Sequence, residues 1–412
     1  MIESFLIEKF GEGAILAYQV FYILLAILVP SMLLFFAWRF RLAYLKNVFF
    51  RKEGWTLLEI HIPEEIKKTP QAMEMVLESM NVGSGESNFI MRLWHGMTRP
   101  WFSLEIVSFE GRISFFIWTR KRWKAGVVAA IYSQYPTVEI NEVDDYTKQL
   151  PTDLEKYIVW GSEMDLKKPD PYPIKTYKYY EMDKDQDEDL QPKTDPLSSF
   201  IEALGSIGPG EYFCFQIIIR KHKKEKKVQG SLFKKQSWRE EGKEIVKKLK
   251  TGDQVKSVGE DNQPIIMLSN MERSFIESME RNLSKHAFDC GMRILYITEK
   301  NSFDVTRLST IPGALGQFGD EIHNSFDKAR GHDPMNWFWQ DVDRIRGARI
   351  SKRIFDAYRF RAYFHMPYIS PHFTLSAEEV ASVFHFPGKV VTTPTFERIR
   401  SKKAEAPVNI PQ

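Results

Sequence analysis

The longest hydrophobic stretch of the chain lies near its N-terminus, where residues 13–38 contain no Asp, Glu, Lys or Arg. Its central run, VFYILLAILVPSMLLFFAW, is apolar on every side, whereas a soluble amphipathic helix would show a polar face. At about 1.5 Å per residue, a helix over this stretch exceeds the roughly 30 Å hydrocarbon core of a bilayer. The pattern therefore predicts one transmembrane helix over 13–38, between a short extracytoplasmic N-terminus (1–12) and a basic juxtamembrane segment (39–54).

The charges on either side of this stretch predict the orientation of the helix. Acidic residues outnumber basic ones before it, and basic residues follow it. Because Lys and Arg collect on the cytoplasmic side of spanning helices, we expect the N-terminus outside and the bulk of the chain inside, at an inner (cytoplasmic) membrane. The residues expected at the cytoplasmic interface are Trp38, Arg39, Arg41, Lys46, Arg51 and Lys52. A cleaved signal peptide and a buried helix are the alternatives, although a signal peptide would need a basic start and a cleavage site.

Residues 55–145 alternate between strand-like and helix-like patterns. A tight hairpin signal, Glu110-Gly111, joins the strand-like runs WFSLEIVSF and RISFFIWTR. Strands are also expected over TLLEIHI and TVEINEV, and helices over Pro63–Asn81 and Trp123–Tyr135. This order, β-α-β-β-α-β, predicts a ferredoxin-like domain. The aromatic residues of its central strands are expected in the core rather than exposed for RNA binding.

A second α+β domain is expected over 173–385, after a linker at 146–172. Its predicted strands are TYKYYEM (176–182), EYFCFQIIIRK and CGMRILYIT. Helices are expected over PLSSFIEALGSI, with Asp195 as the N-cap, over Met271–His286 and Leu308–Phe318, and over Leu375–Phe386, which starts with a capping box. We interpret this segment as another ferredoxin-like unit with a basic insertion at 221–250, followed by a C-terminal tail (386–412). The predicted fold class is α+β.

The basic insertion contains 12 Lys or Arg and 4 Glu within residues 221–250, a local charge of +8. Such a stretch is typical of a solvated helical arm, of a contact to anionic lipid, or of a nucleic-acid contact. Trp238 inside it favours an interfacial or stacking role over a bare linker. The candidate contact residues are Lys221, Lys223, Lys224, Lys226, Lys227, Lys234, Lys235, Trp238 and Arg239.

Composition changes this picture in two ways. The chain has 412 residues with 57 Lys or Arg and 54 Asp or Glu, so its formal charge is only +3. This balance argues against a surface that binds nucleic acid everywhere. The only cysteines, Cys214 and Cys290, exclude a disulfide scaffold and agree with a reducing compartment. Both lie in apolar strand-like runs, so we expect them to be buried.

The sequence contains none of the common catalytic motifs. It has no G-x-x-x-x-G-K-[ST] phosphate loop, no H-E-x-x-H, no C-x-x-C and no G-x-S-x-G. The nine histidines do not cluster at the spacing of metal ligands. We therefore expect no enzymatic activity, no cofactor and no metal site in this chain.

Four features together carry a resemblance to a known family. They are the short N-terminus with one anchor and the segments WTLLEIHIPEE, DPLSSFIEALGSIGPGEYFCFQIIIR and VFHFPGKVVTTPTFERIRSKKAEAPVNIPQ. Over essentially its whole length, the chain resembles the non-ATPase N-terminal region that precedes the motor in membrane-anchored type IV secretion or conjugation-type ATPases of small-genome bacterial lineages. The resemblance implies a cytoplasmic scaffold that couples a membrane to a motor. The sequence departs from the pattern where the motor would begin, so no phosphate-loop residues are carried over.

The resulting hypothesis is a non-enzymatic, membrane-anchored assembly subunit of a type IV secretion or conjugative DNA-transfer machine. Its expected partners are the lipid bilayer and a separate P-loop ATPase, and the pattern also allows a homo-oligomer. A membrane-tethered enzyme with an unrecognised site and a nucleic-acid-binding adaptor that uses 221–250 are the alternatives. A deep cleft with converging buried ionisable groups would favour the enzyme.

Overall fold

The computed structural model describes most of the chain, and its contacts separate into two compact units. The described residues are 12–63, 68–83, 88–151, 153, 156–183, 195–223, 226–227, 235–251, 255–258, 264–266, 269–329 and 345–388. The first unit comprises Met1–Gly54 and Ser84–Arg99, and the second comprises Trp55–Gly83 and Pro100–Gln412.

The first unit contains a long helix, α2 (Glu12–Glu53), and a short one, α4 (Phe89–Trp94). Helix α2 has 42 residues and continues through Pro30 without a break. It ends at Gly54, which has a φ of 65° and donates its N–H to the carbonyl of Phe50, as is common at helix C-termini. The predicted transmembrane and juxtamembrane segments therefore form one continuous helix.

The second unit is built on one antiparallel sheet, to which nine strands contribute within the described residues. Along the sheet the strand order is β12-β5-β11-β6-β2-β3-β1-β4, and β15 pairs with the first residues of β11. The bounds are β1 Trp55–His61, β2 Phe102–Phe109, β3 Arg112–Arg120, β4 Glu139–Val143, β5 Tyr157–Leu166, β6 Glu211–Lys221, β11 Ala287–Glu299, β12 Phe326–Lys328 and β15 Phe373–Ser376. Glu110 and Gly111 both have positive φ between β2 and β3, so the predicted hairpin turn is confirmed.

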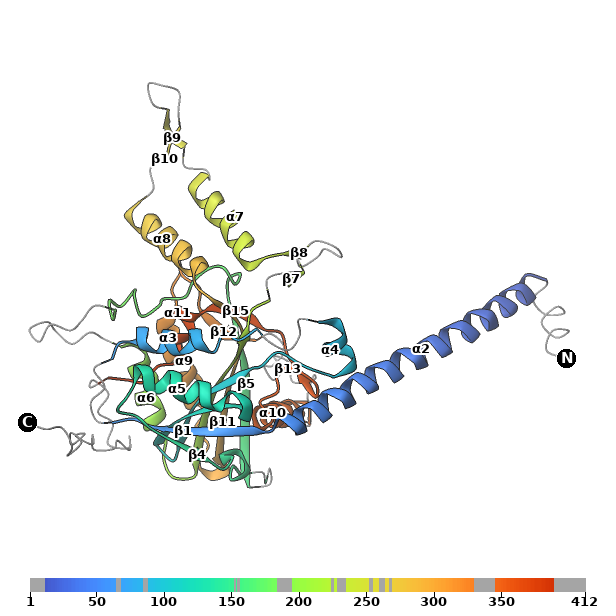
Figure 1. Ribbon diagram of the computed structural model, residues 1–412, viewed down its shortest axis with the longest axis horizontal. Coiled ribbons are helices and arrows are strands. Elements are labelled where there is room, and N and C mark those ends of the chain that lie inside the picture. The colour runs from blue at the N-terminus through green and yellow to red at the C-terminus, as the bar shows by residue number, and fades with distance from the viewer. Residues whose placement is uncertain are drawn as a thin grey trace, which may run out of the picture. The chain divides into compact units, whose positions relative to one another are not determined.

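Helices α3, α5, α6, α9 and α11 pack on one face of this sheet and enclose the main hydrophobic core (Figure 1). They span Pro70–Ser79, Lys124–Gln134, Pro196–Gly205, Arg307–Ala314 and Ala377–Val383. Asp195 accepts a hydrogen bond from the backbone of Leu197 at 2.8 Å, and Ser376 and Glu379 form the expected capping box. The core aromatics Phe102 and Phe115 are buried, as the alternating pattern predicts.

The opposite face of the sheet is covered by α10 (Ile345–Arg359) and the segment that follows it. Two glycines allow this cover to approach the strands. A Cβ added at Gly291 would lie 2.4 Å from the ring of Tyr363, and one at Gly161 would lie 2.7 Å from Ile354. Both faces of the central strands are therefore buried.

Helices α7 (Trp238–Thr251) and α8 (Asn270–Ser284) pack against each other around a small separate core. Trp238 is 3% exposed within it, so its ring is not available for stacking on a base or for insertion into lipid, contrary to the predicted role. The remaining described elements are short: β7 Lys226–Lys227, β8 Lys235–Gln236, β9 Val255–Val258, β10 Pro264–Ile266, β13 Phe364–His365, β14 Tyr368–Ile369, and the 3₁₀ helices η1 Lys121–Trp123, η2 Tyr146–Lys148, η3 Lys300–Ser302 and η4 Leu315–Phe318.

The structure confirms the α+β class and the long apolar N-terminal helix, and it corrects two predicted elements. The segment 146–172, expected as a linker, contains β5, which lies inside the sheet between β11 and β12. The strand expected at 176–182 is a series of turns instead, because Tyr177 is buried between helices, where its hydroxyl donates to Glu74 at 2.7 Å. The acidic run beyond residue 183 and the tail beyond 388 lie outside the described residues.

Candidate functional site

The six residues expected at a membrane interface all lie on the last part of α2. They are Trp38, Arg39, Arg41, Lys46, Arg51 and Lys52. None of the most apolar 18-residue window of α2 is buried by other parts of the protein. A helix of this length and composition is compatible with a single membrane span or with a signal sequence.

Helix α4 packs beside this part of α2 and was not predicted from the sequence. The guanidinium of Arg41 donates to the carbonyl of Leu93 at 3.3 Å and lies 4.7 Å from the ring centre of Trp94. A Cβ added at Gly96 would lie 2.5 Å from the backbone of Leu45, so the chain after α4 touches α2 directly. Four of the five large apolar side chains of α4 are nevertheless exposed, by 67%, 59%, 43% and 60% for Phe89, Ile90, Met91 and Trp94. The only sequence signal for this helix is the apolar run FIMRLW, which is too short to show a helical period.

The structure distributes the candidate contact residues of the basic insertion over three places. Lys221 ends β6, and Lys223 is exposed just after it. Strands β7 and β8 contain Lys226, Lys227 and Lys235, whereas Lys224 and Lys234 lie outside the described residues. Trp238 and Arg239 begin α7. The insertion is therefore partly a hairpin and partly a helix.

Three of these residues, Lys221, Trp238 and Arg239, line one pocket with a volume of about 790 Å³. Its other lining residues come from the end of β6, the start of α7, the start of β11 and the chain after α3. They are Asn81, His222, Ser237, Glu240, Lys243, His286 and Ala287. Within the described lining, Lys221, Arg239 and Lys243 supply three cationic groups. Glu240 supplies a carboxylate, which accepts a hydrogen bond from the backbone N–H of Ser237.

His222 in the pocket wall is held by a buried carboxylate. Asp289 on β11 lies 2.7 Å from its Nδ1 and also accepts from Nε of Arg220 at 2.9 Å. Among the described residues, Nε2 of His222 and the indole nitrogen of Trp238 are enclosed without a hydrogen-bond partner. The wall of this pocket therefore combines fixed positive charge with unsatisfied polar atoms.

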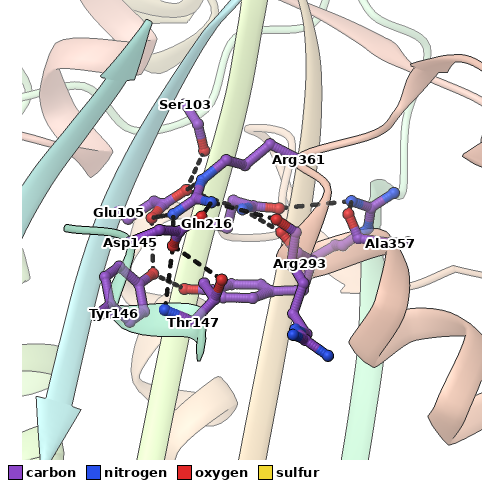
Figure 2. A network of polar contacts seen from close by, with 11 residues as sticks. Ser103, Glu105, Asp145, Tyr146, Thr147, Gln216, Arg293, Ala357 and Arg361 are labelled. Atoms are coloured by element: carbon purple, nitrogen blue, oxygen red, sulfur yellow. Dashed lines mark hydrogen bonds and ion pairs between the residues drawn. The ribbon is translucent and has the colours of Figure 1, made fainter. Parts of the chain in front are cut away.

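A second group of ionisable residues lies on the sheet face beneath α10, and Figure 2 shows part of it. Four neighbouring strands each contribute one residue to a row of directly paired positions, in the order Glu105, Gln216, Arg293 and Glu163. Gln216 donates to Glu105 at 3.0 Å, and Arg293 donates to Glu163 at 2.9 Å. Arg293 also donates to the carbonyls of Ala357 and Ala362, so the row is tied to the cover above it.

Arg361 completes this network from the segment after α10. It has a φ of 47° and is 1% exposed. Its guanidinium makes five hydrogen bonds, two to Glu105, two to Asp145 and one to the carbonyl of Arg359, which matches its five N–H donors (Figure 2). Tyr146 donates to Glu105 at 2.6 Å and is in hydrogen-bond contact with Tyr358.

The network is electrostatically complete, and this decides what it can do chemically. Burial alone would lower the pKa of Arg361, but the carboxylates of Glu105 and Asp145 outweigh burial and raise that pKa. Burial raises the pKa of Tyr146 and of Tyr358 well above the ordinary value, so both hydroxyls stay neutral. Each charge already has a counter-charge, and this pairing favours a structural role over acid–base chemistry.

Comparisons with known proteins add one match. A family model described as a domain of unknown function (DUF8128) matches residues 50–398. The match covers the sheet and its helices and begins near the end of α2. No curated protein matches the chain. Among the described residues, no group of three or more His, Cys, Asp or Glu is placed to hold a metal ion.

Proposed function

This chain belongs to the family described as a domain of unknown function, DUF8128, and we propose that it is a non-enzymatic assembly subunit anchored in a membrane. The observation that carries the proposal is α2, which is apolar over more than a membrane thickness and is not buried by the rest of the protein. A core helix of a soluble protein would have a buried face. In our proposal α2 spans an inner membrane once, with its N-terminus outside and the sheet on the cytoplasmic side.

The basic end of α2 supports this orientation. Arg39, Arg41, Lys46, Arg51 and Lys52 follow the apolar part, and Lys and Arg are retained on the cytoplasmic side. Trp38 is placed where aromatic side chains prefer the boundary between lipid and water. Because α2 continues well past this point, its last turns emerge from the bilayer in our proposal.

The exposed side chains of α4 are the second support. Phe89, Ile90, Met91 and Trp94 would form an unfavourable apolar patch in water, and α4 packs beside Arg41, one of the proposed interface residues. We propose that α4 lies in the headgroup region, with these side chains toward the acyl chains. In that arrangement α2 and α4 would both anchor the first unit in the membrane.

The proposed partner is a separate P-loop ATPase of a type IV secretion or conjugative DNA-transfer system. The support is the resemblance of the sequence to the non-ATPase region that precedes such motors, together with the absence of a phosphate loop from this sequence. The strand order β4-β1-β3-β2 supports a ferredoxin-like arrangement for the first half of the sheet. The paired charges beneath α10 support a scaffold rather than an enzyme.

The test is reconstitution with a motor. The full chain is purified in detergent, alone and after co-expression with a P-loop ATPase encoded by a neighbouring gene. We expect a stable complex on size-exclusion chromatography, and ATP hydrolysis only in fractions that contain the motor. A motor with its phosphate-loop Lys replaced by Ala is the control and should bind without hydrolysis. ATP hydrolysis by the chain alone would contradict the proposal.

A further inference from the structure

We propose that the pocket between the end of β6, the start of α7 and the start of β11 binds a small phosphate-bearing molecule. This goes beyond the scaffold function and does not depend on it. The pocket volume of about 790 Å³ lies within the roughly 300–1,000 Å³ range of small-molecule sites. A contact to a flat bilayer surface would not need a cavity of this kind.

The charge of the lining identifies the class of ligand. Lys221, Arg239 and Lys243 come from two elements and line one cavity, and Glu240 adds one carboxylate to the described lining. Arg and Lys are the side chains that bind phosphate oxygens most strongly, since their hydrogen bonds to it are charge-assisted. His222 and His286 add imidazole groups to the same lining. An anion with several oxygen acceptors fits this set.

Several of these groups are held in place before any ligand enters. The carboxylate of Asp289 fixes Nδ1 of His222, and the guanidinium of Arg239 donates to the carbonyl of Lys285 at 3.0 Å. The start of α7 also faces the pocket, and the first backbone N–H groups of a helix favour an anion. The wall encloses the indole nitrogen of Trp238 and Nε2 of His222 without partners among the described residues.

The buried position of Trp238 separates this proposal from nucleic-acid binding. Strand-binding proteins stack bases on exposed aromatic rings along a groove. Here the indole ring of Trp238 is 3% exposed and belongs to the same small core as Val246, Phe275 and Leu283. The chemistry of the pocket is thus directed at a phosphate group and not at a base.

The experiment measures pyrophosphate binding to the full chain in phosphatidylcholine nanodiscs by isothermal titration calorimetry. Lys243→Gln and Lys221→Gln each remove one cation from the lining. We expect each to weaken binding about tenfold, the effect of losing one charge-assisted hydrogen bond. Lys248→Gln is the matched control, since it makes the same change on the same helix outside the lining and should leave the dissociation constant unchanged. Unfolding temperatures without ligand identify any variant that is misfolded.

Three outcomes would overturn the proposal. The first is no heat of binding at millimolar pyrophosphate. The second is equal weakening by Lys248→Gln, which would mean diffuse attraction to the basic surface. The third is a competitor that binds more tightly than pyrophosphate and displaces it. Displacement by a single-stranded 12-mer without terminal phosphate would reassign the site to nucleic acid. Displacement by phosphatidylglycerol in the nanodisc would reassign the site to lipid.

Discussion

Single residues on the sheet face covered by α10 show why alternation of polar and apolar residues does not by itself identify which strand positions are buried. In the strand FSLEIVSF, Ser103 and Glu105 occupy positions that alternate with the core residues, so they read as solvent-facing. Both are fully buried, because α10 and Arg361, some 250 residues later, cover them. No local signal in the sequence marks Arg361 as the counter-charge. The buried cysteines and core aromatics were predictable, because apolar side chains in strands need no distant partner.

Arg361→Gln tests the buried network. The substitution leaves Glu105 without its cation and Asp145 without its main partner, and breaking a buried pair costs about 3–5 kcal/mol of unfolding free energy. Chemical denaturation of the detergent-solubilised chain measures the loss. Lys124→Gln breaks an exposed pair with Glu142 and serves as the control, with little change expected. Equal effects of the two substitutions would show that the network does not stabilise the fold.

Glu379 gives the fold a pH dependence near neutrality. Burial raises the pKa of this capping carboxyl from 4.5 to about 7, although the backbone N–H groups of Ser376 and Ile174 donate to it. The pKa of Glu379 is higher in the folded chain than in the unfolded chain. Its contribution to the free energy of unfolding is therefore fully present below pH 4.5 and is lost as the pH rises through 7. The loss amounts to about 3 kcal/mol.

The measurement is the unfolding free energy of the full chain at pH 5, 6, 7 and 8. We expect a fall over this range in the native chain and a flatter profile in Glu379→Gln, which stays neutral throughout. Asp145 and Asp195 have lowered pKa values, and their effects fall at acidic pH, outside this window. A native profile as flat as that of the variant would contradict the assignment to Glu379.

At the scale of elements, capping and turn chemistry were predictable, whereas pairing was not. Glu110-Gly111 and the Ser376–Glu379 box are defined by a few neighbouring residues, and the structure confirms both. Strand β5 was missed because its run YIVWGSEMDL mixes charges with apolar residues. Glu163 in it is buried, where it pairs with Arg293 and accepts a hydrogen bond from Ser370. The turns at 176–182 resemble a strand because Tyr177 and Tyr179 alternate with Thr176 and Lys178.

Helix α4 provides a prediction at this scale. A fluorophore attached at Phe89→Cys, in the full chain reconstituted into vesicles, should be quenched by a lipid with a shallow doxyl group, because this side chain lies in the headgroup region in our proposal. The same label at Asn141→Cys, on the exposed and polar strand β4, should be quenched much less. Cys214 and Cys290 are buried and should not react. Similar quenching at both positions would argue against an interfacial α4.

At the scale of the whole molecule, the sequence suggested two α+β domains, and the structure shows one continuous sheet within the second unit. All of strand β2 pairs with β6 and this pairing joins the two halves, although about 100 residues separate the two strands. Such long-range pairing depends on the register between two distant strands, and the pattern of polar and apolar residues along the sequence does not specify which strands pair. The apolar part of the N-terminal helix, in contrast, depends only on local composition and was predictable, whereas its continuation to Glu53 was not predicted.

The central claim is a single membrane span with the sheet on the cytoplasmic side, and thiol labelling in intact cells tests it directly. Single cysteines are introduced at Ser4, before the span, and at Ser133 on α5, after it. Burial raises the pKa of both native thiols, so the background should be silent. We predict that a membrane-impermeant maleimide labels Ser4→Cys in intact cells and Ser133→Cys only after permeabilisation. Labelling of Ser133→Cys in intact cells, or release of the chain by alkaline carbonate, would contradict the account.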